Sequence, residues 1–257
     1  MKERLDILLA ERRLVESRTK AKWLIKNGYV LVNGCLIKKP SKKVDNSYEI
    51  TLKAPFPYVG RGGLKLEAAL NEFSILVKQK ICVDIGASIG GFTDCLLKHG
   101  ALKVFAIDTA KDILHPSLLC NKKQVVPLLG VDARKLSSLG EKVDIVVVDI
   151  TFSSLKEVLP NLFNFLKIGG DIVVLVKPIF ETNFYEEQKF EIIKNKATLR
   201  EILQDLLKWS TKNKLFPQAV IKSPILGKGG SIEFLIHFKL ENSYDDENYI
   251  KLIEKIV

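Results

Sequence analysis

The sequence has few cysteines and histidines, and none of them stands at the spacing of a metal site. Its four cysteines occur singly, without a C-x-x-C pair, and its three histidines are far apart. Zinc sites need closely spaced thiolate and imidazole ligands, and disulfide frameworks need cysteines in regular sets. The sequence therefore excludes a zinc knuckle and a disulfide scaffold, and we expect no metal.

Long apolar runs are also missing. No run approaches the roughly 18 residues of a membrane-spanning helix. Residues 1–6 carry alternating charges and lack the apolar core of a signal peptide. We therefore expect a soluble, cytoplasmic protein without a membrane partner.

Positive charge is concentrated at the N-terminus. The chain has 257 residues, 47% of them hydrophobic, and a net charge of +10. Residues 1–53 hold 13 Lys and Arg against 6 Asp and Glu, so they contribute +7 of this charge. Clustered cations gain affinity for phosphate backbones by releasing counterions. A merely Lys-rich sequence would spread its charge evenly, so this distribution indicates a polyanion-binding module.

The N-terminal segment has the pattern of a small α+β module. Apolar residues at helical spacing over 5–9 predict a first helix. Ser17 is a suitable N-cap for a second helix, in which basic residues are expected to be solvated, and Asn27-Gly28 ends it. Two β-prone runs flank Asn33-Gly34, which is a strong hairpin signal.

This order of basic helix, hairpin and basic tail resembles the RNA-binding fold of the ribosomal protein S-four type, over Ser17 to Gly34. The alternative is a solvated charged helix face, but helix, hairpin and charge together favour RNA binding. The resemblance implies RNA contacts from basic residues of one face, which we take as Arg18, Lys20, Lys22, Lys26, Lys38, Lys39, Lys42 and Lys43.

Arg4-Leu5-Asp6 also matches a catalytic motif of pseudouridine synthases, which often carry this module. Here the motif falls within the first helix of the module itself. We therefore expect Asp6 to be a surface residue without a catalytic role.

The rest of the chain alternates apolar strands with helices after a proline-rich break at residues 54–57. Strands are expected at 81–85, 104–107, 125–128, 144–148 and 171–176, and a helix at 155–166. Near-continuous apolar strands of this kind form parallel sheets covered on both faces. The predicted fold class is α/β, a Rossmann-like sheet with a small α+β N-terminal RNA-binding domain.

A glycine-rich turn follows the first of these strands. Asp84-x-Gly86-x-x-x-Gly90-Gly91 begins with an acid in the strand end, unlike the G-x-G-x-x-G of dinucleotide-binding proteins, and suits S-adenosylmethionine. Asp108 ends the second strand, where an acid can hold ribose hydroxyls. The expected cofactor contacts are Asp84, Gly86, Ser88, Gly90, Gly91 and Phe92 for the methionine side, Asp108 for the ribose and Asp132 for the adenine edge.

Five segments in order resemble the TlyA family, historically labelled haemolysins, whose catalytic domain is of the FtsJ type. They are residues 58–66, 84–97, 148–155, 175–181 and 229–234. Family members methylate cytidine 2′-hydroxyls in ribosomal RNA with S-adenosylmethionine, so the resemblance implies ribosomal RNA or ribosomal subunits as partners. The expected division is an RNA-binding domain at 1–54, a linker at 55–59, a methyltransferase domain at 60–240 and a C-terminal tail at 241–257.

The resemblance places the FtsJ-type Lys-Asp-Lys-Glu tetrad at Lys65, Asp149, Lys177 and Glu233. A ribose hydroxyl is a poor nucleophile, so it must be oriented and deprotonated. We expect Lys177 nearest the 2′-oxygen, oriented by Asp149, with the other two positioning the ribose. Taken singly, each residue could be an ordinary surface or capping charge; the four matches in their expected motifs favour catalysis.

Some positions depart from the family pattern. Residues 109–112 replace a glycine-rich segment, Ile179 replaces a glutamine, and residues 182–198 look helical where glycines are usual. Arg61 and the turn at 228–230 are further candidate RNA contacts. Two rival functions remain, a non-catalytic RNA-binding factor of the ribosome and, with less support, a membrane-active haemolysin.

Overall fold

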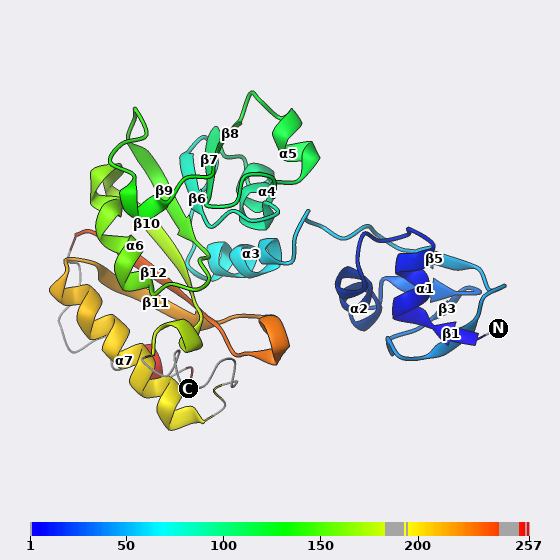
Figure 1. The fold of residues 1–257 in the computed structure, drawn as a ribbon. Coiled ribbons are helices and arrows are strands. Elements are labelled where there is room, and N and C mark those ends of the chain that lie inside the picture. The colour runs from blue at the N-terminus through cyan, green and yellow to red at the C-terminus, as the bar shows by residue number, and fades with distance from the viewer. Residues whose placement is uncertain (1, 183–192, 194, 242–251, 255, 257) are drawn as a thin grey trace. The chain divides into compact units, whose positions relative to one another are not determined.

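A computed structural model describes residues 2–182, 193, 195–241, 252–254 and 256 of the chain (Figure 1). The chain divides into two compact units, Met1–Pro57 and Tyr58–Val257. The division falls inside the predicted linker at 55–59. Most of the helix expected over 182–198, and most of the tail after 241, lie outside the described residues.

The N-terminal unit packs two helices on short strands. Its elements are β1 (Lys2–Arg4), α1 (Leu5–Glu11), α2 (Arg18–Lys26), β2 (Val30–Val32), β3 (Cys35–Leu36), β4 (Lys43–Asp45) and β5 (Ile50–Leu52). Strands β3, β2 and β5 form one antiparallel sheet, and β1 pairs with β4. Leu5, Leu24 and Ile25 are fully buried between these elements. Helical spacing of apolar residues thus becomes the core of a small domain.

The helix cap and the hairpin turn predicted for this unit are both present in the structure. The Ser17 hydroxyl accepts a hydrogen bond from Lys20 N at 3.3 Å and so caps α2. Asn33 and Gly34 both have positive φ, 47° and 76°, as a two-residue hairpin of type I′ requires. Phe56, expected in the linker, packs edge-to-face on Trp23 with ring centroids 5.1 Å apart.

The second unit is built on a seven-stranded sheet. Its helices and strands are α3 (Gly62–Glu72), β6 (Ile81–Ile85), α4 (Gly91–Lys98), β7 (Lys103–Asp108), α5 (Pro116–Cys120), β8 (Val125–Leu129), β9 (Val143–Val148), α6 (Leu155–Val158), β10 (Leu166–Val176), α7 (Lys196–Lys212), β11 (Phe216–Lys222) and β12 (Phe234–Lys239). The strand order is β11-β12-β10-β9-β6-β7-β8. Strands β6 to β10 are parallel, and β12 runs antiparallel to both of its neighbours.

Helices cover both faces of this sheet (Figure 1). Helices α3 and α4 pack together on one face, while α6 and α7 contribute to the large apolar core on the other. The helix expected at 155–166 is wrong in length. It ends at Val158 and continues as a 3₁₀ turn (Leu159–Asn164), because Pro160 cannot donate the hydrogen bond that an α-helix needs there.

Strand β6 marks the point where the strand order reverses. Its neighbours β7 and β9 follow it in the chain on opposite sides. Connections leaving the carboxyl ends of β6 and β9 therefore diverge and open a crevice, where open α/β sheets bind ligands. No helix among the described residues is long and apolar enough to cross a membrane.

Candidate active site

A cavity of about 490 Å³ lies at the carboxyl ends of β6, β7 and β9. This size is in the range of small-molecule sites, which span roughly 300–1,000 Å³. Five of the predicted site residues line it, namely Gly86, Ser88, Asp108, Asp132 and Asp149. The cavity thus has acceptor side chains around an apolar interior that includes Ile85 and Ile107.

The turn after β6 needs glycine for close packing. Gly86 has φ of +80°, and a Cβ there would lie 2.3 Å from the carbonyl oxygen of Asp149. A Cβ at Gly90, with φ of +96°, would meet the side chain of Leu118 at 2.1 Å. Gly91 packs against the backbone at the start of α3. Gly90, Gly91 and the buried Phe92 therefore shape the turn from behind, and none of them lines the cavity.

Asp108 organises the cavity wall at the end of β7. Its two carboxylate oxygens accept hydrogen bonds from Ser88 N and Ala110 N, each at 2.8 Å. Each oxygen retains a lone pair, so the carboxylate can also accept from a ligand hydroxyl. Asp132 is engaged differently, because Arg134 donates to both of its oxygens, with Nε at 3.0 Å from Oδ1 and Nη2 at 2.8 Å from Oδ2.

We expect Asp108→Ala to weaken the binding of S-adenosylmethionine, because a charge-assisted hydrogen bond contributes about 1.5–3 kcal/mol. Calorimetric titration measures the loss, and the melting transition checks that the fold survives. Asp112→Ala, at an exposed acid four residues along the chain, is the matched control. Unchanged affinity in the Asp108 variant would remove this residue from the site.

Asp84 is buried at the end of β6. Its Oδ2 accepts from the Thr93 hydroxyl at 2.6 Å, while Oδ1 has no hydrogen-bond partner among the described residues. Burial raises the pKa of this carboxyl to about 7, and the nearby charge of Asp149 adds to the rise. The Thr93 hydrogen bond acts in the opposite direction.

This shift makes stability depend on pH. Between about pH 4 and 7 the unfolded chain ionises Asp84 while the folded chain keeps it protonated, so stability falls as pH rises through this window. Asp84→Asn cannot ionise and escapes this loss. We expect urea unfolding to show the variant gaining on the parent from pH 4.5 to pH 8, by up to about 1.4 kcal/mol per pH unit. An equal stability difference at both pH values would contradict the shift; Asp112→Asn is the control.

Lys177, which follows β10, forms one ion pair and donates two hydrogen bonds. Its Nζ lies 2.5 Å from Asp149 Oδ1, 2.8 Å from the carbonyl of Ile150 and 3.0 Å from the Thr151 hydroxyl. The expected Lys177–Asp149 pair is therefore present in the geometry. The side chains of both residues are mostly buried, with exposed fractions of 16% and 23%.

Lys65 and Glu233 form the second pair. Lys65 Nζ lies 2.5 Å from Glu233 Oε2, and both side chains are buried. Val176 of β10 pairs with Phe234 of β12, so Lys177 and Glu233 occupy the adjoining positions at the end of this ladder. Sheet register thus brings the two lysine–carboxylate pairs to one end of the sheet, beside the cavity that Asp149 lines.

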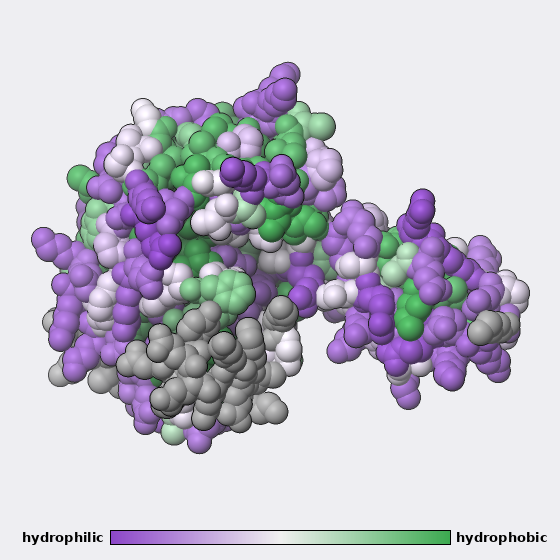
Figure 2. All heavy atoms as spheres, viewed as in Figure 1, coloured by the Kyte–Doolittle hydropathy of each residue, from purple (hydrophilic) through white to green (hydrophobic). Residues whose placement is uncertain are grey.

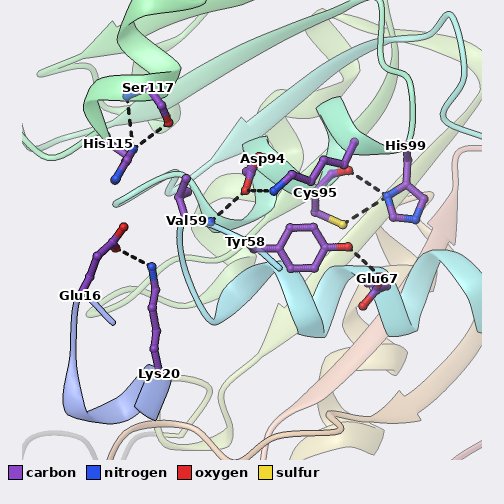
Figure 3. A network of polar contacts seen from close by, with 11 residues as sticks. Glu16, Lys20, Tyr58, Val59, Glu67, Asp94, Cys95, His99, His115 and Ser117 are labelled. Atoms are coloured by element: carbon purple, nitrogen blue, oxygen red, sulfur yellow. Dashed lines mark hydrogen bonds and ion pairs between the residues drawn. The ribbon is translucent and has the colours of Figure 1, made fainter. Parts of the chain in front are cut away.

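The helix that carries Lys65 is fixed by contacts around Tyr58 (Figure 3). The Tyr58 hydroxyl donates to Glu67 Oε1 at 2.8 Å, and Val59 N donates to Asp94 Oδ2 of α4 at 2.8 Å. Gly63 lies under the Tyr58 ring, where a Cβ would be 2.3 Å from it. Burial raises the pKa of Tyr58, which keeps its hydroxyl a donor. These contacts join α3 to α4.

Sequence reasoning missed several residues of the site. Phe152 lines the cavity with 64% of its surface exposed, has φ of +67° and contacts Phe180 at 5.7 Å between ring centroids. Glu181 caps α6, accepting from Ser154 Oγ and Leu155 N. Arg134 holds Asp132. The sequence gives no signal for these roles, because each depends on a partner that the fold brings close: Phe180 for Phe152, α6 for Glu181 and Asp132 for Arg134.

Two expectations for the N-terminal unit are wrong. Lys20 is not solvated: it is 8% exposed, with Nζ 2.6 Å from Glu16 (Figure 3). The same Nζ lies over the Phe56 ring. Asp6 is not a surface residue, since its exposure is 0%. The remaining predicted RNA contacts are on the surface: Arg18, Lys22, Lys26, Lys38, Lys39, Lys42, Lys43 and, in the second unit, Arg61. Hydrophilic residues cover most of the visible face of the N-terminal unit (Figure 2).

The described positions among those that depart from the expected pattern have ordinary structural places, whereas most of residues 182–198 lie outside the described residues. Thr109 lines the cavity, and Lys111 packs against Gly130. Ile179 is half-buried in the 3₁₀ turn Pro178–Phe180. None of them disturbs the two lysine–carboxylate pairs.

Comparison with known families agrees with this geometry. Residues 58–240 match the FtsJ-like methyltransferase family, and residues 3–50 match the S4 domain. The chain belongs to the FtsJ-like methyltransferase family. The predicted fold class, a methyltransferase sheet with an N-terminal S4 module, is thereby confirmed.

Relatives extend this assignment over nearly the whole chain. The candidate rRNA methyltransferase YqxC of Bacillus subtilis is 39% identical, covering 92% of this FtsJ-like chain and 85% of that protein. The 16S/23S rRNA (cytidine-2′-O)-methyltransferase TlyA of Mycobacterium tuberculosis is 34% identical, covering 93% and 90%. A solved structure described as a hemolysin from Streptococcus thermophilus has a TM-score of 0.72 at 33% identity, covering 99% and 95%. The resemblance to the TlyA family is confirmed.

Proposed function

We propose that this chain transfers a methyl group from S-adenosylmethionine to a ribose 2′-hydroxyl of ribosomal RNA, at a cytidine, in the cytoplasm. The observation that carries the proposal is the meeting of the Lys177–Asp149 and Lys65–Glu233 pairs at one end of the sheet beside the cavity. The TlyA relative named as a cytidine 2′-O-methyltransferase supports the choice of nucleotide.

The cavity fits the cofactor by its chemistry. Asp108 would accept from ribose hydroxyls, while the Asp132–Arg134 pair would border the adenine. The close turn at Gly86 would let the methionine part of the cofactor contact the protein backbone, and Asp84 is buried behind this turn. The cofactor supplies an electrophilic methyl group on a positively charged sulfur, and the acids around the cavity favour that charge.

The four tetrad residues divide the remaining work. A neutral amine has two N–H donors, which suffice for its hydrogen bonds to the Ile150 carbonyl and the Thr151 hydroxyl. Lys177 in this form can therefore turn its lone pair to the 2′-hydroxyl while it stays in contact with Asp149. Nζ then takes the hydroxyl proton, while Asp149 keeps the amine in place. Lys65 and Glu233, locked to each other, orient the ribose from the β12 side.

The test is methyl incorporation into ribosomal RNA lacking this modification. Purified chain, S-adenosylmethionine and ribosomal subunits from a strain without the gene are combined, and nucleosides are analysed by mass spectrometry. We expect 2′-O-methylcytidine in at least one subunit. RNA binding without any methylated ribose would instead support the non-catalytic ribosome-associated factor.

A further inference from the structure

The N-terminal S4 unit contains a fully buried carboxylate in the first turn of α1. Asp6 accepts hydrogen bonds from Arg4 Nε at 3.0 Å, Arg4 Nη2 at 3.2 Å and Arg18 Nη2 at 3.1 Å. Lys22 Nζ lies 3.9 Å from Asp6 Oδ2. One carboxylate of α1 is therefore shared by three cations, of which two come from α2 and one from β1, the strand before α1.

The three cations around Asp6 remain accessible. Their side chains are 38%, 51% and 48% exposed for Arg4, Arg18 and Lys22, whereas that of Asp6 is 0% exposed. The cluster presents a net charge of +2, and its acid lies beneath the cations. Arg18 uses one Nη on Asp6 and has no other acceptor among the described residues, so its remaining N–H donors can reach a ligand.

Asp6 is held in its ionised form by the arginines around it. Burial alone would raise the pKa of this carboxyl, but the hydrogen bonds from Arg4 and Arg18 overcome it and hold the pKa below its usual range. The ionised carboxylate offsets the mutual repulsion of the cations and restricts the rotamers of two long side chains. Arg18 and Lys22, one helical turn apart on α2, are thereby held beside Arg4.

We propose that Arg4, Arg18 and Lys22 form a preorganised phosphate-binding site for the RNA backbone and that Asp6 is its positioning residue. The site rests on the proposed function, because that function supplies the RNA. Guanidinium groups with fixed orientation bind phosphate oxygens through paired, charge-assisted hydrogen bonds. The exposed lysines at 38, 39, 42 and 43 contribute point charges around it.

The proposal predicts a result opposite in sign to simple charge counting. Asp6→Asn makes the chain more positive, which by itself would tighten RNA binding. We expect the full-length variant to bind deproteinised ribosomal RNA about threefold more weakly or worse at moderate salt, and the slope of log affinity against log salt to fall by about 0.7–0.9 for each lost phosphate contact. Glu11→Gln, the same charge change at an exposed position of α1, should not weaken binding.

A double-mutant cycle separates positioning from mere folding. Arg18→Gln should cost less affinity in the Asp6→Asn background than in the parent, because its orientation is already lost. Calorimetry with S-adenosylmethionine should show unchanged cofactor affinity. RNA binding by Asp6→Asn that equals or exceeds that of the parent would overturn the proposal.

A second variant serves if Asp6→Asn fails to fold. Arg4→Gln should lower affinity and salt slope as much as Arg18→Gln, whereas Arg13→Gln, at an exposed arginine just after α1, should have a smaller effect. Equal slopes for Arg4→Gln and Arg13→Gln would overturn the site. Binding is measured without methyl transfer, so a chain that binds RNA in this way and transfers no methyl group refutes the proposed function only.

Discussion

Replacing Lys177 with alanine is expected to reduce methyl transfer by about 10²–10⁴-fold, the usual contribution of a positioned acid or base. The amine lies 2.5 Å from Asp149, which lines the cavity, so its loss removes the group proposed to take the 2′-hydroxyl proton. Single-turnover transfer of labelled methyl groups to ribosomal subunits measures the effect. Cofactor affinity should change little, and a melting curve measures the stability that is lost when Asp149 is left without its partner.

Lys177→Arg separates base catalysis from simple charge. A guanidinium stays protonated and cannot accept the proton, so this variant should remain as inactive as the alanine variant. Lys167→Ala, on the same strand but with a 44% exposed side chain paired with Asp144, is the control and should be fully active. Full activity of Lys177→Arg would mean that only positive charge is needed, and the general-base role would have to be abandoned.

Much of the fold follows from local patterns in the sequence. The Ser17 cap, the Asn33-Gly34 hairpin and the apolar strands predict elements that the structure contains, because each depends on residues close together in the chain. The length of the helix after Ser154 was mispredicted, although Pro160 stands in its middle. The apolar pattern over 155–166 favours one long helix, whereas Pro160 favours an early end of the α-helix, and the proline decides the outcome.

Burial of charged residues could not be predicted in the same way. Lys20 and Asp6 look like solvated charges in the sequence. In the structure, Lys20 is paired with Glu16. Asp6 is paired with Arg4 and Arg18. Helical wheels place a residue on a face but do not say which long side chains fold over it. The pairing of Lys65 with Glu233 is likewise invisible locally, since 168 residues separate them; only the family resemblance grouped them.

The Lys65–Glu233 pair should be strongly destabilising to break and nearly neutral to replace. Lys65→Met leaves Glu233, 4% exposed, without its partner, and removing one member of a buried pair costs about 3–5 kcal/mol. The double variant Lys65→Met with Glu233→Gln removes both charges and should recover most of this loss in urea unfolding. The partly exposed pair Lys103–Glu141 is the control, where Lys103→Met should cost less than about 1 kcal/mol.

Activity of that double variant decides what the pair is for. If Lys65 and Glu233 position the ribose, methyl transfer stays low even though stability returns, because an uncharged pair of similar volume cannot hold the ribose hydroxyls as the ion pair does. The defect should appear in transfer to ribosomal subunits while calorimetric affinity for S-adenosylmethionine is kept. A stable double variant with parental methyl transfer would show that the pair only joins α3 to β12, and would reduce the catalytic set to Lys177 and Asp149.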